Sequence, residues 1–205
     1  MQTEPNQERA TQLSPEPAIV AIGRYLSLGW QIFTEDLFGW ILLCLIYFAV
    51  LGVVSTTGIG VLVVLGPLEA GWYAVILKRL RQGTLDIGEF AKGFHHFVSA
   101  FLIGAVVSVF ASVGFVFLIA PGIVILALYL FVFPILLDTG QDFWGVMEAS
   151  RKAVAPRWFE WSLFVLAQLV LIVLGSLLCG VGLLVALPWT KIATAVAYEE
   201  HFRER

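Results

Sequence analysis

Charged residues are absent from three long stretches of this chain, and their absence limits what it can fold into. No Asp, Glu, Lys or Arg occurs in residues 37–68, 93–137 or 161–190, which are runs of 32, 45 and 30 residues. Beyond one charged residue each, Glu69 and Lys191, the first and third runs continue as apolar sequence. Each stretch is then about twice the length of one transmembrane helix, which needs about 20 residues. The pattern predicts an all-α integral membrane protein with six transmembrane helices arranged as three hairpins.

Glycine and proline near the middle of each run mark the predicted turn of its hairpin, because both residues favour non-helical backbone dihedrals. These predicted turn residues are Gly58 and Gly60, Pro121 and Gly122, and Gly180 and Gly182. The second helix of each hairpin contains one proline at which a kink is predicted, namely Pro67, Pro134 and Pro188.

A shorter amphipathic segment precedes each hairpin, at residues 22–33, 87–94 and 143–154. An apolar stripe beside charged side chains suits a helix that lies in the membrane interface. The alternative is a helix that packs back on the bundle. With these segments the same unit occurs three times, at about residues 18–82, 83–140 and 141–205, which predicts a pseudo-threefold parallel repeat within a single membrane domain, residues 18–205.

The basic residues predict the orientation of the chain. If each hairpin enters and leaves on one side, that side holds 11 of the 12 Lys and Arg residues, and the three opposite turns hold none. Because basic loops remain in the cytoplasm, both termini are expected there. Residues 1–17 are polar and are predicted to be a disordered tail. They lack the basic and apolar regions of a cleavable signal peptide.

Several residues resemble those of a known group of proteins. They include Gly66-Pro67-Leu68, Phe133-Pro134, Asp138, Asp142-Phe143-Trp144, Glu148-Ala149-Ser150, Arg157-Trp158, Cys179-Gly180-Val181-Gly182, Pro188 and Ala197-Tyr198. The chain resembles uncharacterised bacterial integral membrane proteins related to the membrane domain of some glycerophosphoryl diester phosphodiesterases. The resemblance implies a location in the bacterial cytoplasmic (inner) membrane. The phosphodiesterase catalytic domain has no counterpart in this sequence, so that activity is not implied.

Glu69 and Lys191 are the two charged residues inside predicted spans. Each lies nine residues after a predicted turn glycine, Gly60 or Gly182, so both are expected at a similar depth near the middle of the membrane. A charge there costs about 2.5–3.5 kcal/mol, which favours neutralisation by an opposite charge. The spacing predicts a polar pair, with snorkelling of Lys191 or protonation of Glu69 as the alternatives.

The composition excludes several classes of function and leaves three. Hydrophobic residues make up 60% and charged residues 13% of the chain, which does not fit disorder, nucleic-acid binding or a disulfide scaffold. Cys44 and Cys179 are expected as reduced thiols, and no pattern predicts a metal site or cofactor. The first expectation is a non-catalytic membrane protein that scaffolds, assembles or regulates membrane components. A small transporter or lipid-handling protein that uses the Glu69–Lys191 pair is the alternative, and an intramembrane enzyme is the least favoured. Membrane lipids and other membrane proteins are the expected partners.

Overall fold

The computed structural model describes residues 20–58, 60–177 and 180–202, and every regular element in these ranges is a helix. The elements in chain order are α2 (Ile22–Glu35), α3 (Leu37–Ser55), α4 (Gly60–Gln82), the 3₁₀-helix η1 (Ile87–Phe94), α5 (Phe97–Phe117), α6 (Ile119–Leu128), α7 (Val132–Thr139), α8 (Phe143–Val154), the short 3₁₀-helix η2 (Ala155–Arg157), α9 (Trp158–Leu177) and α10 (Leu183–Phe202). The predicted all-α class is confirmed for these residues. The predicted tail and Cys179 lie outside the described residues.

Five helical stretches in the described part of the chain are long and apolar enough to cross a membrane. They are Leu37–Ser55, Gly60–Gln82, Phe97–Val116, Ile119–Thr139 and Phe143–Leu177. Helix α10 has a similar length, but its 20 residues include Lys191, Glu199 and Glu200, and it is not among them. The apolar helices indicate a membrane protein, with five such stretches where the sequence predicts six spans.

The long apolar helices form antiparallel pairs with a neighbour in the chain. At the connected ends of α9 and α10, Gly175 lies against the backbone of Gly182. At the far ends of the same two helices, the rings of Trp161 and His201 are 5.5 Å apart. Contacts follow the same antiparallel order between α3 and α4 and between α5 and α6.

The predicted turn at Pro121 and Gly122 is wrong. Extended backbone at Leu118 (φ −168°, ψ 151°) separates α5 from α6, and both predicted turn residues lie in the first turn of α6. Proline fits there because the first N–H groups of a helix have no intrahelical acceptor. Gly122 is buried, and the backbone of Gly114 packs against it.

The four remaining predicted turn glycines lie at or beside the connections. Gly58 and Gly180 have positive φ angles of 67° and 78°, which glycine adopts without steric cost. Gly60 is the first residue of α4, and Gly182 precedes α10 directly.

The predicted second helix of the middle hairpin is divided into α6 and α7, whereas Pro67 and Pro188 lie within the continuous helices α4 and α10. Pro134 lies in the first turn of α7, where its missing N–H has no intrahelical acceptor to lose. The side chain of Ser150 in α8 forms hydrogen bonds with backbone groups at both ends of the break. Its Oγ donates to the Leu128 carbonyl (2.9 Å) and accepts from the Phe131 N–H (3.3 Å).

The three predicted amphipathic segments correspond to α2, η1 and α8, and each contacts one of the proline-containing helices. Helix α2 packs on α10, η1 packs on α4, and α8 packs on α7. Gly29 of α2 lies against the backbone of Ala193, and Gly93 of η1 lies against the backbone of Gly71. The segments therefore pack on the bundle, which was the alternative to a purely interfacial position.

The middle segment is a 3₁₀-helix rather than the α-helix that its sequence predicts. In a 3₁₀-helix, side chains three residues apart lie on one face. This spacing places Phe90 and Gly93, both buried, on the same face of η1. The carbonyl of Phe90 approaches Gly71 of α4, and a side chain at residue 71 would collide with it. Close backbone contact with α4 therefore accompanies the tighter helix.

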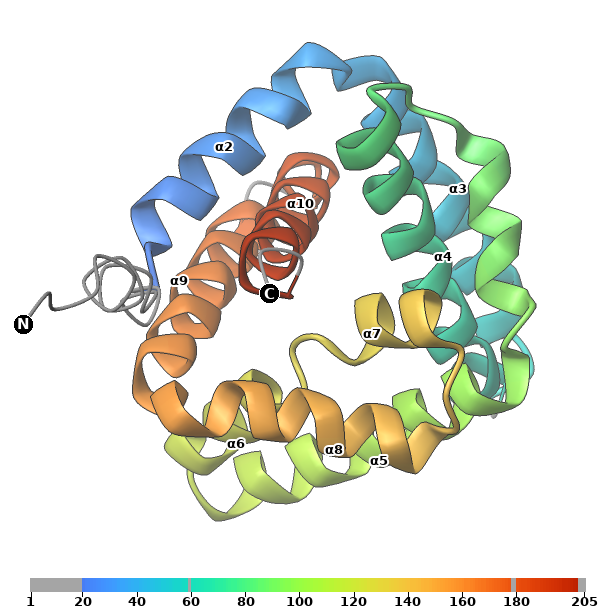
Figure 1. The fold of residues 1–205 in the computed structure, drawn as a ribbon. Coiled ribbons are helices and arrows are strands. Elements are labelled where there is room, and N and C mark those ends of the chain that lie inside the picture. Colours follow the sequence, from blue (N-terminus) through green and yellow to red (C-terminus); the bar gives the residue numbers. More distant parts are fainter. Residues whose placement is uncertain (1–19, 59, 178–179, 203–205) are drawn as a thin grey trace, which may run out of the picture.

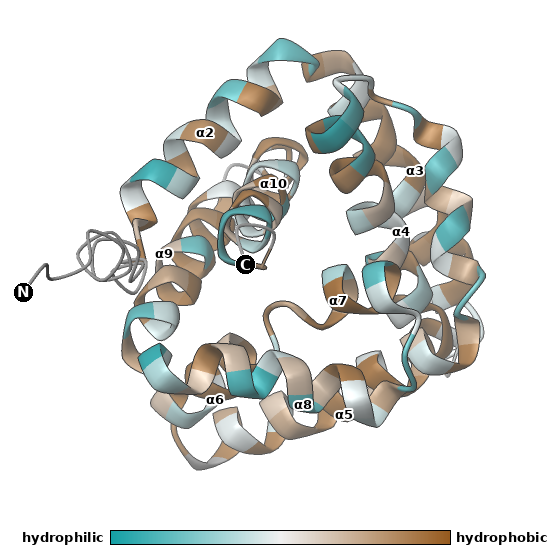
Figure 2. Cartoon of the chain, viewed as in Figure 1, coloured by the Kyte–Doolittle hydropathy of each residue, from teal (hydrophilic) through white to brown (hydrophobic). Residues whose placement is uncertain are grey.

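Figure 1 shows the arrangement of these elements. Helices α2, α3, η1, α5, α6, α8 and α9 form the outline of the molecule in this view, and α4, α7 and α10 lie closer to its middle. Hydrophilic residues mark α2, α8 and the C-terminal end of α10 in Figure 2, while α3, α5 and α9 are largely hydrophobic. The proline-containing helices therefore form the inner layer.

Replacing Gly66 by Ala should separate α4 from α5. A Cβ at residue 66 would collide with the backbone carbonyl of Ala100, which cannot move without shifting α5. Overpacking of this kind costs about 1–3 kcal/mol. We expect a lower unfolding temperature of the detergent-solubilised protein. The control is Gly52→Ala in α3, where nothing lies within 4 Å of the added Cβ. Equal unfolding temperatures for the two variants would contradict the close contact.

Candidate functional site

Glu69 and Lys191 come together between α4 and α10. The Lys191 Nζ donates a hydrogen bond to Glu69 Oε2, and the Tyr47 hydroxyl of α3 donates to Glu69 Oε1 (2.8 Å). The side chains of Glu69 and Lys191 are 20% and 14% exposed. Both carboxylate oxygens are thus occupied, and the charge of Glu69 is compensated inside the bundle.

Aromatic rings surround the ammonium group of this pair. The Lys191 Nζ lies 6.0 Å from the ring centroid of Trp72 and 5.8 Å from that of Tyr73. A cation near the face of an aromatic ring is stabilised by the quadrupole of the ring. Trp72 and Cys44 are fully buried, so little water reaches this side of the pair.

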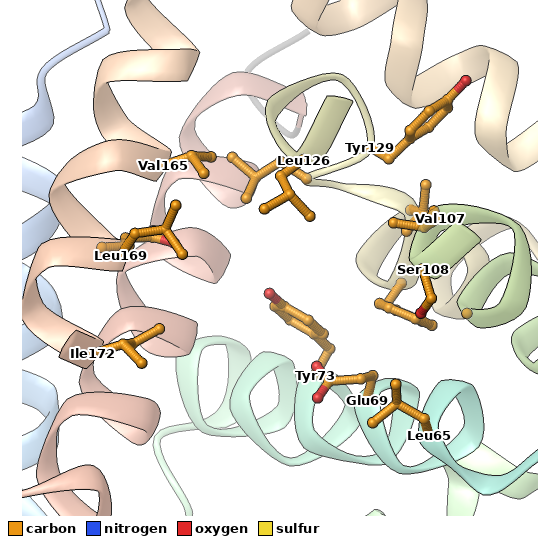
Figure 3. Close-up of a pocket in the computed structure, with 15 residues that line it drawn as sticks. Leu65, Glu69, Tyr73, Val107, Ser108, Leu126, Tyr129, Val165, Leu169 and Ile172 are labelled. Carbon is orange, nitrogen blue, oxygen red and sulfur yellow. The ribbon is translucent and has the colours of Figure 1, made fainter. Parts of the chain in front are cut away.

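A cavity of about 290 Å³ lies on the other side of Glu69, between α4, α5, α6, α7 and α9. We call it the central cavity. Figure 3 shows the side chains of Glu69 and Tyr73 next to each other on α4, with Leu169 and Ile172 of α9 across the space. Apolar side chains supply most of its wall, including Leu65, Val107, Leu126, Leu130, Val165 and Leu169. Its volume is close to the lower end of the range for ligand pockets, about 300 Å³.

A few polar groups interrupt this apolar wall. Besides Glu69 they are Tyr73, Ser108, Tyr129 and Gln168. The Gln168 Nε2 donates to the Thr194 hydroxyl (2.9 Å) and to the Thr190 carbonyl (3.4 Å), which fixes the amide against α10. The cavity therefore combines an apolar body with a small number of oriented polar groups, which is typical of a binding site for a small molecule.

Ion pairs connect the ends of the inner helices. The Arg81 guanidinium of α4 bonds both carboxylate oxygens of Asp138 at the end of α7, each at 2.7 Å. The same guanidinium bonds Glu199 of α10 (2.7 Å), and the Tyr198 hydroxyl donates to Asp138 (2.9 Å). We call these four residues the Arg81 cluster. A bidentate pair of this kind is stronger than a single hydrogen bond and fixes geometry.

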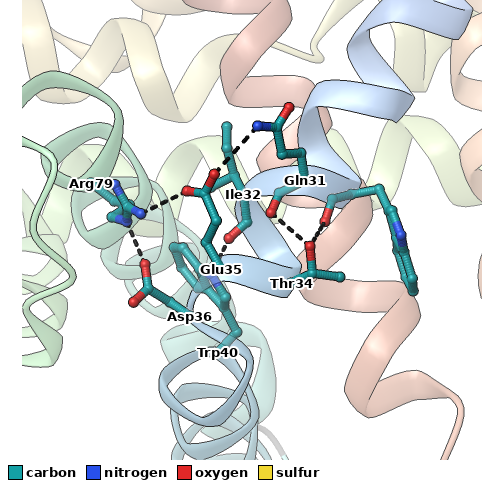
Figure 4. A network of polar contacts seen from close by, with 8 residues as sticks. Gln31, Ile32, Thr34, Glu35, Asp36, Trp40 and Arg79 are labelled. Carbon is teal, nitrogen blue, oxygen red and sulfur yellow. Dashed lines mark hydrogen bonds and ion pairs between the residues drawn. The ribbon is translucent and has the colours of Figure 1, made fainter.

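Two neighbouring ion-pair groups hold the outer segments to α4. Arg79 bonds Asp36 (2.5 Å) and Glu35 (2.9 Å) at the junction of α2 and α3, as Figure 4 shows. Lys78 bonds Asp86 (2.7 Å) and Glu89 (2.9 Å) at the start of η1. The Lys78 ammonium and the N–H of Gly88 keep the pKa of Asp86 below its usual value. The hydrogen bonds of Glu89 with Lys92 and Lys78 lower its pKa in the same way.

The comparisons with known proteins identify no relative. No family model, no curated protein and no solved structure matches the chain. The resemblance to the membrane domain of glycerophosphoryl diester phosphodiesterases therefore stays a prediction, and the function has to be argued from the geometry. Among the described residues, no group of three or more His, Cys, Asp and Glu could hold a metal ion.

The sequence predicts the Glu69–Lys191 pair, and the structure brings these two residues together. The sequence does not predict the partner Tyr47, the central cavity or the Arg81 cluster. Tyr47 and Glu69 lie at equal distances in sequence, eleven residues, on either side of Gly58. In an antiparallel pair such positions face each other, so this spacing could have identified the contact. The cavity wall comes from five helices, and no local pattern in the sequence indicates it.

A double-mutant cycle tests the Glu69–Lys191 interaction. Glu69→Gln or Lys191→Met alone leaves one buried charge unpaired, a loss that costs about 3–5 kcal/mol. Replacing both residues removes both charges, so we expect a smaller loss of stability than the sum of the single losses. The measurement is the unfolding temperature of the purified protein in detergent, with Tyr47→Phe as a variant that removes only the neutral donor. Strictly additive losses would show that the two residues do not interact.

Proposed function

We propose that this chain is a multi-pass protein of the bacterial cytoplasmic membrane that binds a lipid-like molecule in the central cavity. The observation that carries the proposal is the mainly apolar space of about 290 Å³ beside the Glu69–Lys191 pair. A space of this size, lined by a few oriented polar groups, favours a ligand over a purely structural role.

The proposed membrane arrangement includes α10 as a sixth span. The charge of Lys191 is compensated by Glu69, and most of α10 is buried against other helices rather than exposed to lipid. Three hairpins would then be α3–α4, α5 with α6 and α7, and α9–α10. The amphipathic segments and the ion pairs at the C-terminal ends of α4, α7 and α10 would lie at the cytoplasmic surface, with both termini in the cytoplasm. The packing of α2, η1 and α8 on these three helices supports a pseudo-threefold repeat.

The chemistry of the wall favours an uncharged or weakly polar ligand with an apolar chain. Glu69 already accepts hydrogen bonds from Lys191 and Tyr47, so the pair contributes no net charge to the cavity. Apolar side chains of α5, α6 and α9 would contact the chain of the ligand, and the hydroxyls of Tyr73 and Ser108 would bind its polar group. Binding of a molecule taken from the bilayer fits a lipid-handling or transport role better than catalysis.

Scaffolding of other membrane components is the second candidate function. The ion pairs of Arg79, Lys78 and Arg81 connect α2, η1, α7 and α10 to α4, as expected of a rigid framework. In that case the central cavity would hold no specific ligand.

Filling the central cavity should abolish ligand retention. We expect native mass spectrometry of protein purified in mild detergent to show a bound lipid-like molecule. The variant Ser108→Phe places a ring in the cavity and should lose this molecule. The control is Ser112→Phe, one turn further along α5 at an exposed position, which should retain it. A wild-type protein without bound lipid, or equal retention by both variants, would favour scaffolding.

Cysteine labelling tests the proposed membrane arrangement. In a background without Cys44 and Cys179, single cysteines at Thr57, Ala120 or Val181 should react with an impermeant maleimide added to intact cells. Cysteines at Gln82, Thr139 or Gln141 should react only after permeabilisation. All six positions are exposed. The reverse pattern would invert the orientation, and mixed reactivity within one group would contradict six spans.

A further inference from the structure

A second cavity follows the central cavity along the interface of α4 and α7. The central cavity is lined by Glu69 and Tyr73 of α4 and by Val132 and Phe133 of α7. The next residues along both helices line a polar cavity of about 330 Å³, with Ala74 and Leu77 on α4 and Leu137 and Asp138 on α7. The two cavities therefore lie one after the other along the same pair of helices.

Aromatic side chains separate the two cavities. The rings of Tyr73 and Phe133 are stacked, with centroids 6.3 Å apart and an angle of 14° between their planes. Tyr73 is only 6% exposed, and Leu77, one turn further along α4, is 4% exposed. The stacked rings lie in the interface of α4 and α7, between the residues that line the central cavity and those that line the polar cavity.

The Arg81 cluster holds the two helices together at the rim of the polar cavity. Arg81 and Asp138 both line this cavity, and the bidentate pair between them joins α4 directly to α7. Glu199 and Tyr198 extend the connection to α10, the helix that carries Lys191. Side-chain exposures of 30% for Arg81 and 28% for Asp138 place the pair within reach of water.

We propose that the Arg81 cluster is a lock that controls aqueous access to the central cavity. When the bonds between Arg81 and Asp138 open, α4 and α7 separate, the Tyr73–Phe133 stack parts, and the polar cavity becomes continuous with the central cavity. The inference rests on the proposed function for its purpose, since access regulates binding only if the cavity holds a ligand. The lock itself is a property of the helices and is measured without a ligand.

A cysteine in the central cavity reports on this access. Ser108→Cys is introduced into a protein without Cys44 and Cys179, in lipid nanodiscs, and its reaction rate with a charged, membrane-impermeant maleimide is measured. Losing one hydrogen bond between charged groups weakens the closed arrangement enough to increase the open population about tenfold. We expect Arg81→Gln and Asp138→Asn each to raise the labelling rate about tenfold, and Arg81→Lys to raise it less.

Two controls separate the lock from a general loosening of the fold. Arg151→Gln removes another bidentate pair, formed with Glu148 within α8, and should leave the rate at Ser108→Cys unchanged. A reporter at Thr57, in the exposed connection between α3 and α4, should react equally with and without Arg81→Gln. The lock is disproved by unchanged rates at Ser108→Cys in both Arg81→Gln and Asp138→Asn, by an equal rise with Arg151→Gln, or by a rise at Thr57→Cys.

Lipid retention and labelling rates together distinguish a failure of the lock from a failure of the proposed function. Native mass spectrometry of the same wild-type preparation shows whether the cavity retains a lipid. A faster reaction without any retained lipid would support the lock and disprove ligand binding. Retained lipid with unchanged labelling rates would support ligand binding and disprove the lock.

Discussion

The carboxylate of Glu69 sets the main constraint on this structure, because it is the one charge within residues 60–77, the apolar part of α4. A charge in such a place needs a partner, and Lys191 of α10 and Tyr47 of α3 supply its hydrogen bonds. The consecutive helices α3 and α4 are therefore fixed at one point to α10, near the other end of the chain. Removing either ion of the pair leaves the other largely buried without its opposite charge.

Helix α4 is the element through which this constraint reaches the rest of the molecule. Its glycines allow the backbones of α5 and η1 to approach closely at Gly66 and Gly71. Its C-terminal turn carries Lys78, Arg79 and Arg81, and each of them bonds a different part of the chain. One helix thus provides close apolar contacts, the buried pair and the surface ion pairs. A change in its tilt would alter the central cavity and the Arg81 cluster at the same time.

The sequence predicts local features well because the physics behind them is local. Residues 143–154 were predicted as a helix and form α8, and the nine-residue spacing after two glycines placed Glu69 and Lys191 at similar depths. Features that depend on groups far away in the sequence are not predicted by local patterns. The break between α6 and α7 is satisfied by Ser150, about twenty residues further along, and the 3₁₀ geometry of η1 accompanies its close contact with α4. The central cavity depends on five helices together, so no single segment indicates it.

The distribution of polar groups separates contacts that fix the helices from contacts that let them slide, and the proposed ligand entry depends on this difference. Apolar packing between helices is nondirectional, and sliding by a small amount costs little where lipid tails can replace a side chain. Bidentate ion pairs are directional and exist in a bonded or an unbonded state. In the proposed lock, such pairs at the ends of α4, α7 and α10 would give the inner helices a bonded and an unbonded arrangement. The Glu69–Lys191 pair joins α4 directly to α10, whereas Asp138 joins the end of α7 to both helices, so opening the lock would move α7 relative to the other two.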